Sequence, residues 1–130
     1  MPQVRISDAA QFLGVSDDTV RRWVSSGELT AETDDAGKKV IDGATLAHFA
    51  RERRPHLPTP RGSSSARNRF VGLVTSVTSD TVMSQVELQC GPYRVVSLMS
   101  TEAVGELGLE PGSVATASIK ATNVIVDRPE

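Results

Sequence analysis

The chain has a single cysteine, few aromatic residues and no long apolar run. Cys90 is the only cysteine in 130 residues, which excludes an intramolecular disulfide. No apolar stretch approaches the roughly 20 residues that a membrane-spanning helix needs. The N-terminal sequence MPQVRISDAA also lacks the apolar core of a signal peptide. We therefore expect a cytoplasmic globular protein with no membrane partner, in which Cys90 is a structural or incidental thiol.

The chain also lacks a strong charge of either sign. Its net charge is −2, and residues 1–62 carry nine basic and nine acidic side chains, against five and seven in residues 63–130. Any binding of nucleic acid must therefore come from the local placement of cations and not from overall attraction. An enzyme is not expected, because no cluster of His, Cys and carboxylate residues has metal-ligand spacing and no nucleophile has a partnered base.

Prolines gather in one stretch that divides the chain. Residues 55–64, PHLPTPRGSS, hold three prolines and have the composition of a linker. Apolar residues recur at helical spacing before it, and after it they alternate or form short β-branched blocks. We predict an α+β protein with two domains, residues 1–54 and 65–130, joined by this linker. Each domain is short for burying its own core, so we expect oligomerisation.

Two short helices are expected near the N-terminus. Ser7 is a suitable N-cap for the first helix, and Gly14 suits the left-handed conformation that ends one. Ser16 is a second N-cap, and the following Val20 and Trp23 share one face. Two such helices joined by a glycine-containing turn predict a helix-turn-helix. The opposite face of the second helix is polar, which fits either DNA recognition or simple exposure to solvent.

A hairpin and a third helix are expected next. Asp34-Asp35-Ala36-Gly37 is a turn signal between two short extended pieces, and Lys38 and Lys39 follow it. A hairpin with a basic tip can contact the phosphate backbone of DNA. Asp42 or Gly43 then caps a helix that ends before Pro55.

This order of elements resembles the winged DNA-binding domains of the MerR and excisionase families. The residues that carry the resemblance are ISDAAQFLGVSDDTVRRWVSSGEL, and the pattern matches over about residues 4–53. The resemblance implies that the protein binds double-stranded DNA through Ser16, Thr19, Arg21, Arg22, Lys38 and Lys39. The chain departs from the family at Asp17 and Asp18, where relatives often have a basic residue or proline. Two carboxylates there repel phosphate, so one domain alone should bind weakly.

The C-terminal half is predicted to be a small OB-like β-barrel. Turn signals at Ser79-Asp80 and Gly91-Pro92 separate strand-like runs, and Ser100 is a suitable N-cap for a short helix. A strand within residues 114–119 and a last strand in ATNVIVD, residues 121–127, bring the prediction to five strands and one helix.

Residues 65–127 resemble the molybdate-binding domain called Mop or TOBE. Three segments carry the resemblance, in the family's order: SARNRFVGLVTSV, LMSTEAVGELGLEPGS and IKATNVIV. The resemblance implies a homo-oligomer, either a dimer or a larger ring, that binds molybdate or tungstate between subunits. In the family, the Ser-Ala-Arg-Asn segment of one subunit meets the Ile-Lys segment of another. Relatives often have Ser directly after this Lys, where this chain has Ala121.

The chemistry of these segments suits an oxyanion. Molybdate carries two negative charges, so its site needs hydrogen-bond donors and positive charge without inward carboxylates. The site residues implied by the family and this chemistry are Ser65, Ala66, Arg67, Lys120, Ala121 and Thr122, the alanines and Thr122 through backbone N–H groups. No metal-ion ligands are expected.

Together the two resemblances imply a molybdate-responsive DNA-binding regulator. Two alternatives stay open. The protein could store molybdate and use its helical domain for protein contacts, or its ligand could be an organic molybdenum cofactor. The sequence leaves the operator and the sign of regulation undetermined.

Overall fold

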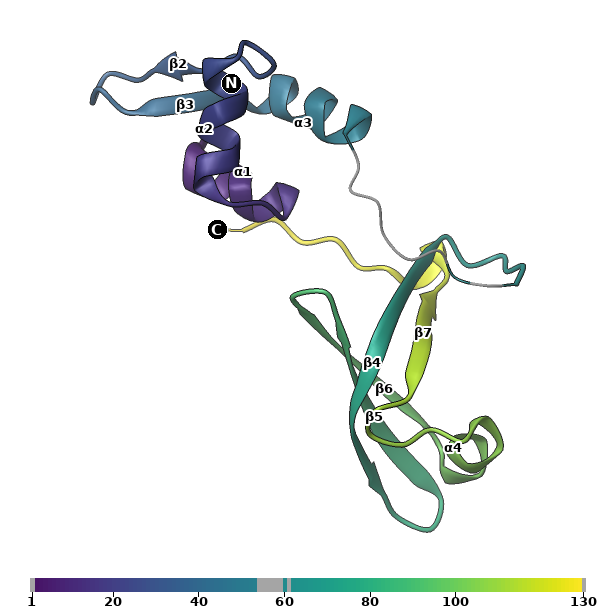
Figure 1. The fold of residues 1–130 in the computed structure, drawn as a ribbon. Coiled ribbons are helices and arrows are strands. Elements are labelled where there is room, and N and C mark those ends of the chain that lie inside the picture. Colours follow the sequence, from purple (N-terminus) through teal and green to yellow (C-terminus); the bar gives the residue numbers. More distant parts are fainter. Residues whose placement is uncertain (1, 54–59, 61, 130) are drawn as a thin grey trace. The chain divides into compact units, whose positions relative to one another are not determined.

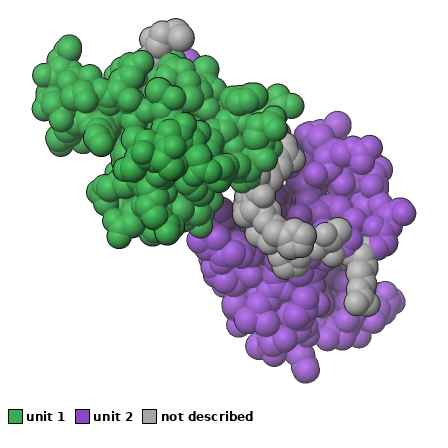
Figure 2. Space-filling view, turned by 45° about the horizontal axis from the view of Figure 1, so that its top comes forward, with its two compact units in different colours: residues 1–57 green, residues 58–130 purple. Residues whose placement is uncertain are grey.

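A computed structural model describes residues 2–53, residue 60 and residues 62–129 (Figure 1). The chain divides into two compact units, residues 1–57 and 58–130, which Figure 2 distinguishes by colour. Most of the predicted linker, namely residues 55–59 and 61, lies outside the described residues. Within the described ranges, no helix is long and apolar enough to cross a membrane.

Unit 1 combines helices with a small antiparallel sheet. Its elements are β1 (Gln3–Arg5), α1 (Ile6–Leu13), α2 (Asp17–Ser25), β2 (Glu32–Thr33), β3 (Lys39–Asp42) and α3 (Gly43–Glu52). The strand order is β1-β3-β2. All three helices and β3 contribute to one core of buried side chains: Ile6, Ala9, Ala10, Val20, Leu29, Ile41, Leu46 and Phe49. The apolar residues that recur at helical spacing in the sequence thus pack together in one core.

Local side chains determine where α2 and α3 begin. The hydroxyl of Ser16 accepts a hydrogen bond from the N–H of Thr19 at 3.2 Å, and the carboxylate of Asp42 accepts one from Thr45 at 3.1 Å. Both predicted N-caps are confirmed. The predicted end of α1 is confirmed as well, because Gly14 has a φ of 69°.

The predicted N-cap of α1 is wrong. The helix begins at Ile6, so Ser7 lies inside its first turn, and Arg5 is the N-cap without a side-chain hydrogen bond. The physical reason for the start at Ile6 is contact with residues far away in the sequence. Arg5 is the last residue of β1 and pairs with Val40 of β3, and Ile6 is then buried in the core of unit 1. Strand pairing and burial therefore set this helix start in place of a capping side chain.

The predicted turn between the two extended pieces is confirmed. Oδ1 of Asp34 accepts hydrogen bonds from the N–H groups of Ala36 at 3.0 Å and Lys38 at 2.8 Å. Gly37 has a φ of 81°, which favours glycine. The turn joins β2 and β3 into an antiparallel hairpin and leaves Lys38 and Lys39 exposed.

Unit 2 is a curled, OB-like antiparallel sheet with one short helix. Its elements are β4 (Asn68–Ser79), β5 (Met83–Cys90), β6 (Tyr93–Ser100), α4 (Thr101–Leu107), β7 (Val114–Ile119) and the 3-10 helix η1 (Ala121–Asn123). The strand order is β6-β5-β4-β7. The core consists of Val74, Val86, Leu88, Cys90 and Val104. Cys90 is therefore a buried structural thiol.

The long strand β4 has two partners. Its first half pairs with β7 and its second half with β5 (Figure 1), and the register of the β4–β5 pair shifts between Val74 and Ser76. A register shift of this kind bends a strand. The bend allows β4 to pair with β7 along its first half and with β5 along its second half. The turns predicted at Ser79-Asp80 and Gly91-Pro92 and the N-cap Ser100 are confirmed.

The predicted fifth strand of unit 2 does not form. Residues 121–123 are a 3-10 helix, and residues 124–127 have no regular structure. A strand needs a neighbour that supplies N–H and C=O groups. The described part of one chain supplies no such neighbour, and Val124, Ile125 and Val126 are 44%, 84% and 87% exposed.

Candidate functional site

The residues expected to bind the oxyanion lie at one end of the β4–β7 pair. The last pair in the register joins Asn68 of β4 to Ile119 of β7. Arg67 precedes Asn68 and Lys120 follows Ile119, so antiparallel pairing brings two cationic residues to the same end of the sheet. The structure therefore places the segments 65–67 and 120–122 together within a single chain, whereas the family resemblance places them across two subunits.

Side chains in the first segment fix its path. The amide side chain of Asn68 donates a hydrogen bond to the carbonyl of Ile119 at 3.1 Å, which ties the two segments together. The hydroxyl of Ser64 accepts a hydrogen bond from the N–H of Ala66 at 3.1 Å, and Ala66 is buried. This N–H already has a partner, so Ala66 is better suited to anchor the segment than to donate to an anion. Neither Ser64 nor Asn68 was among the predicted site residues, although both lie in the segment SSSARN, residues 63–68.

The second segment has two backbone N–H groups, those of Ala121 and Thr122, for which the described residues give no hydrogen bond. Two backbone hydrogen bonds form the turn of η1, from Asn123 to the carbonyl of Lys120 and from Val124 to the carbonyl of Ala121. These bonds do not use the N–H groups of Ala121 and Thr122. Such amides add fixed partial positive charge in the two residues directly after Lys120.

The electrostatics of this end suit an anion. Neither residues 62–79 nor residues 113–126 contain Asp or Glu, so both segments and both strands are free of acidic residues. Ser65, Arg67, Lys120 and Thr122 are all exposed. The site can therefore supply hydroxyl, guanidinium, ammonium and amide donors to a divalent oxyanion without competition from its own carboxylates.

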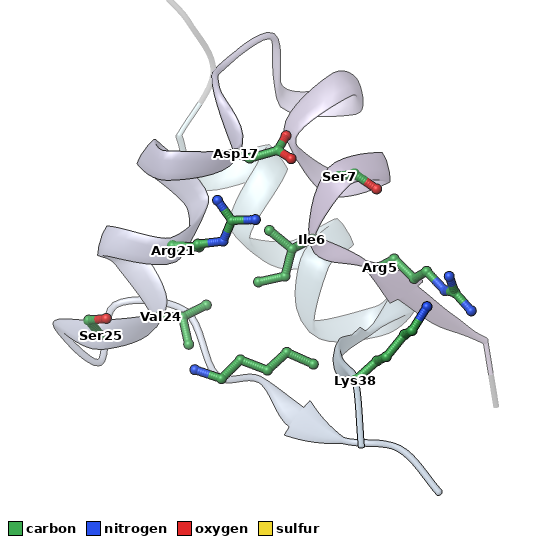
Figure 3. Close-up of a pocket in the computed structure, with 9 residues that line it drawn as sticks. Arg5, Ile6, Ser7, Asp17, Arg21, Val24, Ser25 and Lys38 are labelled. Atoms are coloured by element: carbon green, nitrogen blue, oxygen red, sulfur yellow. The ribbon is translucent and has the colours of Figure 1, made fainter. Parts of the chain in front are cut away.

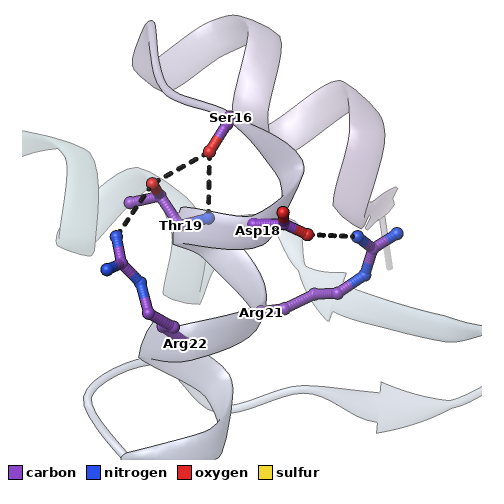
Figure 4. A network of polar contacts seen from close by, with 5 residues as sticks. All are labelled: Ser16, Asp18, Thr19, Arg21 and Arg22. Atoms are coloured by element: carbon purple, nitrogen blue, oxygen red, sulfur yellow. Dashed lines mark hydrogen bonds and ion pairs between the residues drawn. The ribbon is translucent and has the colours of Figure 1, made fainter.

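Four of the six residues expected to contact DNA, namely Ser16, Thr19, Arg21 and Arg22, lie at the start of α2 or along it and make polar contacts there (Figure 4). The hydroxyls of Ser16 and Thr19 are hydrogen-bonded at 3.0 Å, and Arg22 donates to Thr19 at 3.1 Å. Arg21 forms an ion pair with Asp18 at 3.1 Å. Figure 4 shows Arg21 and Arg22 leaving α2 on opposite sides. The carboxylate of Asp18 is thus partly neutralised by the adjacent arginine.

The structure brings only some of these residues around a common hollow. A pocket of about 510 Å³ lies between α2, the start of α1 and the β2–β3 hairpin (Figure 3). Its lining includes three predicted DNA contacts, Arg21, Lys38 and Lys39, together with the unpredicted Arg5. Ser16, Thr19 and Arg22 do not line it.

Arg53, at the end of α3, contacts Glu28 in the loop after α2 and Trp23 of α2. Glu28 accepts hydrogen bonds from Arg53 and from the hydroxyl of Ser26, and the Arg53 guanidinium lies 5.6 Å from the ring centre of Trp23. The hydrogen bond from Arg53, followed by that from Ser26, lowers the pKa of Glu28 below its ordinary value.

Comparison with known proteins identifies the C-terminal half. The TOBE domain family matches residues 64–126. Molybdenum-pterin-binding protein 3 from Clostridium pasteurianum is 37% identical over 65 residues, which cover 49% of this chain and 96% of the relative. The chain belongs to the family of molybdenum-pterin-binding proteins. Within this family, the TOBE domain of the present chain includes the whole candidate oxyanion site.

Further similarities extend this assignment. A molybdate binding protein from Sporomusa ovata superposes with a TM-score of 0.50 at 28% identity, covering 52% of this chain and all of that one. The molybdenum transport protein ModE from Herbaspirillum seropedicae is 36% identical over 64 residues, which cover 48% of this chain and 24% of the relative. A helix-turn-helix domain family matches residues 4–54. This molybdenum-pterin-binding protein family member thus carries a helix-turn-helix domain before its TOBE domain.

Proposed function

We propose that this chain is a molybdate-responsive DNA-binding regulator. The observation that carries the proposal is the pairing of Asn68 with Ile119, which brings Arg67 and Lys120 to one end of two strands that contain no acidic residue. Relatives named for binding molybdate or molybdenum-pterin support molybdate as the ligand. The helix-turn-helix match and the similarity to ModE support a regulatory role.

The proposed DNA-binding unit is a winged helix-turn-helix. In this arrangement α2 enters the major groove, with Thr19 and Arg22 available to base edges, and the β2–β3 hairpin is the wing whose Lys38 and Lys39 contact phosphate. Paired units that read half-sites about 34 Å apart would offset the weak charge of each domain. Molybdate changes DNA affinity only if it binds one arrangement of the subunits more tightly than another.

A homo-oligomer is part of this proposal. The exposed apolar residues Val124, Ile125 and Val126 extend beyond β7 and pair with no strand among the described residues. Unit 2 also has an apolar hollow of about 630 Å³, whose lining includes Val86, Leu88 and Met99. Burial of both features against a second copy removes apolar area from water and completes an oxyanion site at the subunit interface.

Calorimetric titration tests the ligand. Molybdate is expected to bind more tightly than sulfate, and Arg67→Ala is expected to abolish most of the binding heat because the site loses its guanidinium. Arg94→Ala is the matched control, since Arg94 is an exposed arginine on β6 of the same unit and is paired with Glu87 of β5. Tungstate, titrated in parallel, measures selectivity within the class. Unchanged binding in Arg67→Ala would overturn the proposed site.

A gel-shift series with and without molybdate tests regulation. The DNA fragment is first selected from a random pool by the protein itself. Molybdate is expected to change its affinity at least several-fold. Equal affinity at all molybdate concentrations would refute sensing and leave DNA binding in place.

Molybdate storage is the second candidate function. The 65 residues aligned with molybdenum-pterin-binding protein 3 from Clostridium pasteurianum cover 96% of that relative, so a protein of this name needs no helix-turn-helix domain. In a storage protein, unit 1 would contact other proteins. Retention of no duplex in the selection, together with tight molybdate binding, would favour storage.

A further inference from the structure

The pocket of unit 1 contains more positive charge than the DNA-contact residues account for. Its lining includes four cationic side chains, those of Arg5, Arg21, Lys38 and Lys39, and one carboxylate, that of Asp17. We propose that this pocket binds a phosphate of the DNA backbone and that Arg5 is one of its ligands. The inference rests on the DNA binding proposed above and adds a contact outside α2 and the hairpin.

Three of the four cations of this pocket form no ion pair with the described residues. Arg21 is paired with Asp18, but within the described residues Arg5, Lys38 and Lys39 form no ion pair. Like charges around one hollow repel one another, and a bound anion removes that repulsion. The charges come from three separate elements, so no single helix face explains their gathering (Figure 3).

The size of the pocket and its apolar lining residues favour a nucleic-acid backbone over a free oxyanion. The volume of about 510 Å³ far exceeds the share of one water molecule in the liquid, about 30 Å³. Ile6 and Val24 also line it, and apolar side chains suit the face of a sugar better than a fully charged ion. Figure 3 shows Arg21 on the α2 side of the pocket, with Arg5 and Lys38 on the opposite side. A backbone running between these sides contacts both.

The position of Arg5 follows from the strand pairing. Arg5 pairs with Val40, the residue after Lys39, so the β1–β3 pair carries Arg5 to the base of the basic hairpin. Arg5 is exposed and makes no side-chain cap to α1, so its guanidinium is available. Phosphate contacts fix register and carry no base sequence. Arg5 is therefore expected to strengthen binding to all duplexes equally.

Binding of a duplex with arbitrary sequence provides the test. The probe has about 30 base pairs, or about three helical turns, and its affinity is measured by fluorescence anisotropy over a range of salt concentrations. Arg5→Gln is expected to weaken binding several-fold and to reduce the slope of log K against log salt by about 1. Arg51→Gln is the matched control, because it removes an exposed arginine of α3 that does not line the pocket. Thermal melting verifies that both variants fold.

A double-variant cycle tests whether Arg5 and the hairpin share one phosphate. The combination of Arg5→Gln with Lys38→Gln is expected to cost less affinity than the product of the single effects. Equal affinities of Arg5→Gln and Arg51→Gln, with duplex binding intact, would refute this inference and leave the proposed function standing. Absence of any duplex binding by the unaltered protein would refute both. Binding of inorganic phosphate that depends on Arg5, without duplex binding, would make the pocket a small-anion site and overturn the inference.

Discussion

Gly72 lies where β4 exchanges one neighbouring strand for the other. A Cβ atom at this position would lie 2.5 Å from Sγ of Cys90 and 2.9 Å from the carbonyl oxygen of Gln89. The carbonyl belongs to the β5 backbone and cannot move away without disturbing the β4–β5 pairing. Gly72→Ala is therefore expected to destabilise unit 2 by about 1–3 kcal/mol, as measured by calorimetric unfolding.

Gly105 provides the control for this substitution. It lies inside α4, and a Cβ atom there meets nothing within 4 Å. Gly105→Ala is expected to stabilise unit 2 by about 0.5–1 kcal/mol, because alanine loses less conformational entropy in a helix. Equal effects of the two variants would contradict the crowding at Gly72.

Glu28 is expected to make the free energy of unfolding of unit 1 depend on pH in the acidic range. Its pKa lies below the ordinary value of 4.5, mainly through the hydrogen bond from Arg53. A lowered carboxyl pKa contributes stability that is fully present above the ordinary value and is lost as pH falls through the folded-state pKa. Trp23 is the only tryptophan, so its fluorescence reports on the unfolding of unit 1.

Glu28→Gln is accordingly expected to make the unfolding midpoint of unit 1 less dependent on pH below about 4.5. The same measurement on Glu32→Gln serves as the control, because Glu32 lies exposed on β2 and forms no ion pair within the described residues. Identical pH profiles for Glu28→Gln and the unaltered protein would show that the Arg53 hydrogen bond contributes nothing.

At the scale of elements, residues 124–126 after η1 have a sequence typical of a strand but pair with no sheet among the described residues. Replacing Ile125 by Asp is expected to lower the mass of the assembly in sedimentation, since a charge opposes burial of this segment against a second copy. Val82→Asp introduces the same charge at another exposed apolar residue, which is 67% exposed, and should leave the mass unchanged. An unaltered mass in Ile125→Asp would remove this segment from the interface.

The elements that the sequence predicted correctly depend on neighbours close in the chain. Ser16, Asp42 and Ser100 each cap a helix through a backbone N–H three residues later, so the signal and the structure lie within one turn. The fifth strand was predicted wrongly because residues 124–127 have β-forming side chains, but pairing requires a partner that no local pattern reveals.

The residues of the candidate sites differ in how much of their signal is local in the sequence. Arg67 and Lys120 were predicted through the family motif, and their sequence neighbours Ser64 and Asn68 were missed because their roles are contacts to a backbone group. Arg5 carries no local signal at all. It reaches the basic pocket only because β1 pairs with β3, a contact between residues 35 or more positions apart.

At the scale of the whole molecule, the two compact units are expected to unfold as two transitions. Molybdate at 100 times its dissociation constant should stabilise unit 2 by about 2.7 kcal/mol. The Trp23 transition of unit 1 should keep its midpoint. Calorimetry and fluorescence, recorded on the same samples, separate the two effects. A parallel shift of the Trp23 midpoint would show that the units are energetically coupled.

The pairing of β4 with β7 also has a consequence for the rate of folding. Asn68 and Ile119 are 51 positions apart, so their contact closes a long loop. The β4–β5 and β5–β6 hairpins close only short loops, so they are expected to form first. The proposed oxyanion site is thus expected to be assembled by a late step. An anion bound there holds together contacts that are absent from the folding transition state, so it should slow unfolding and leave the folding rate nearly unchanged. In the cell, molybdate would then determine how long each folded copy survives as well as what it binds.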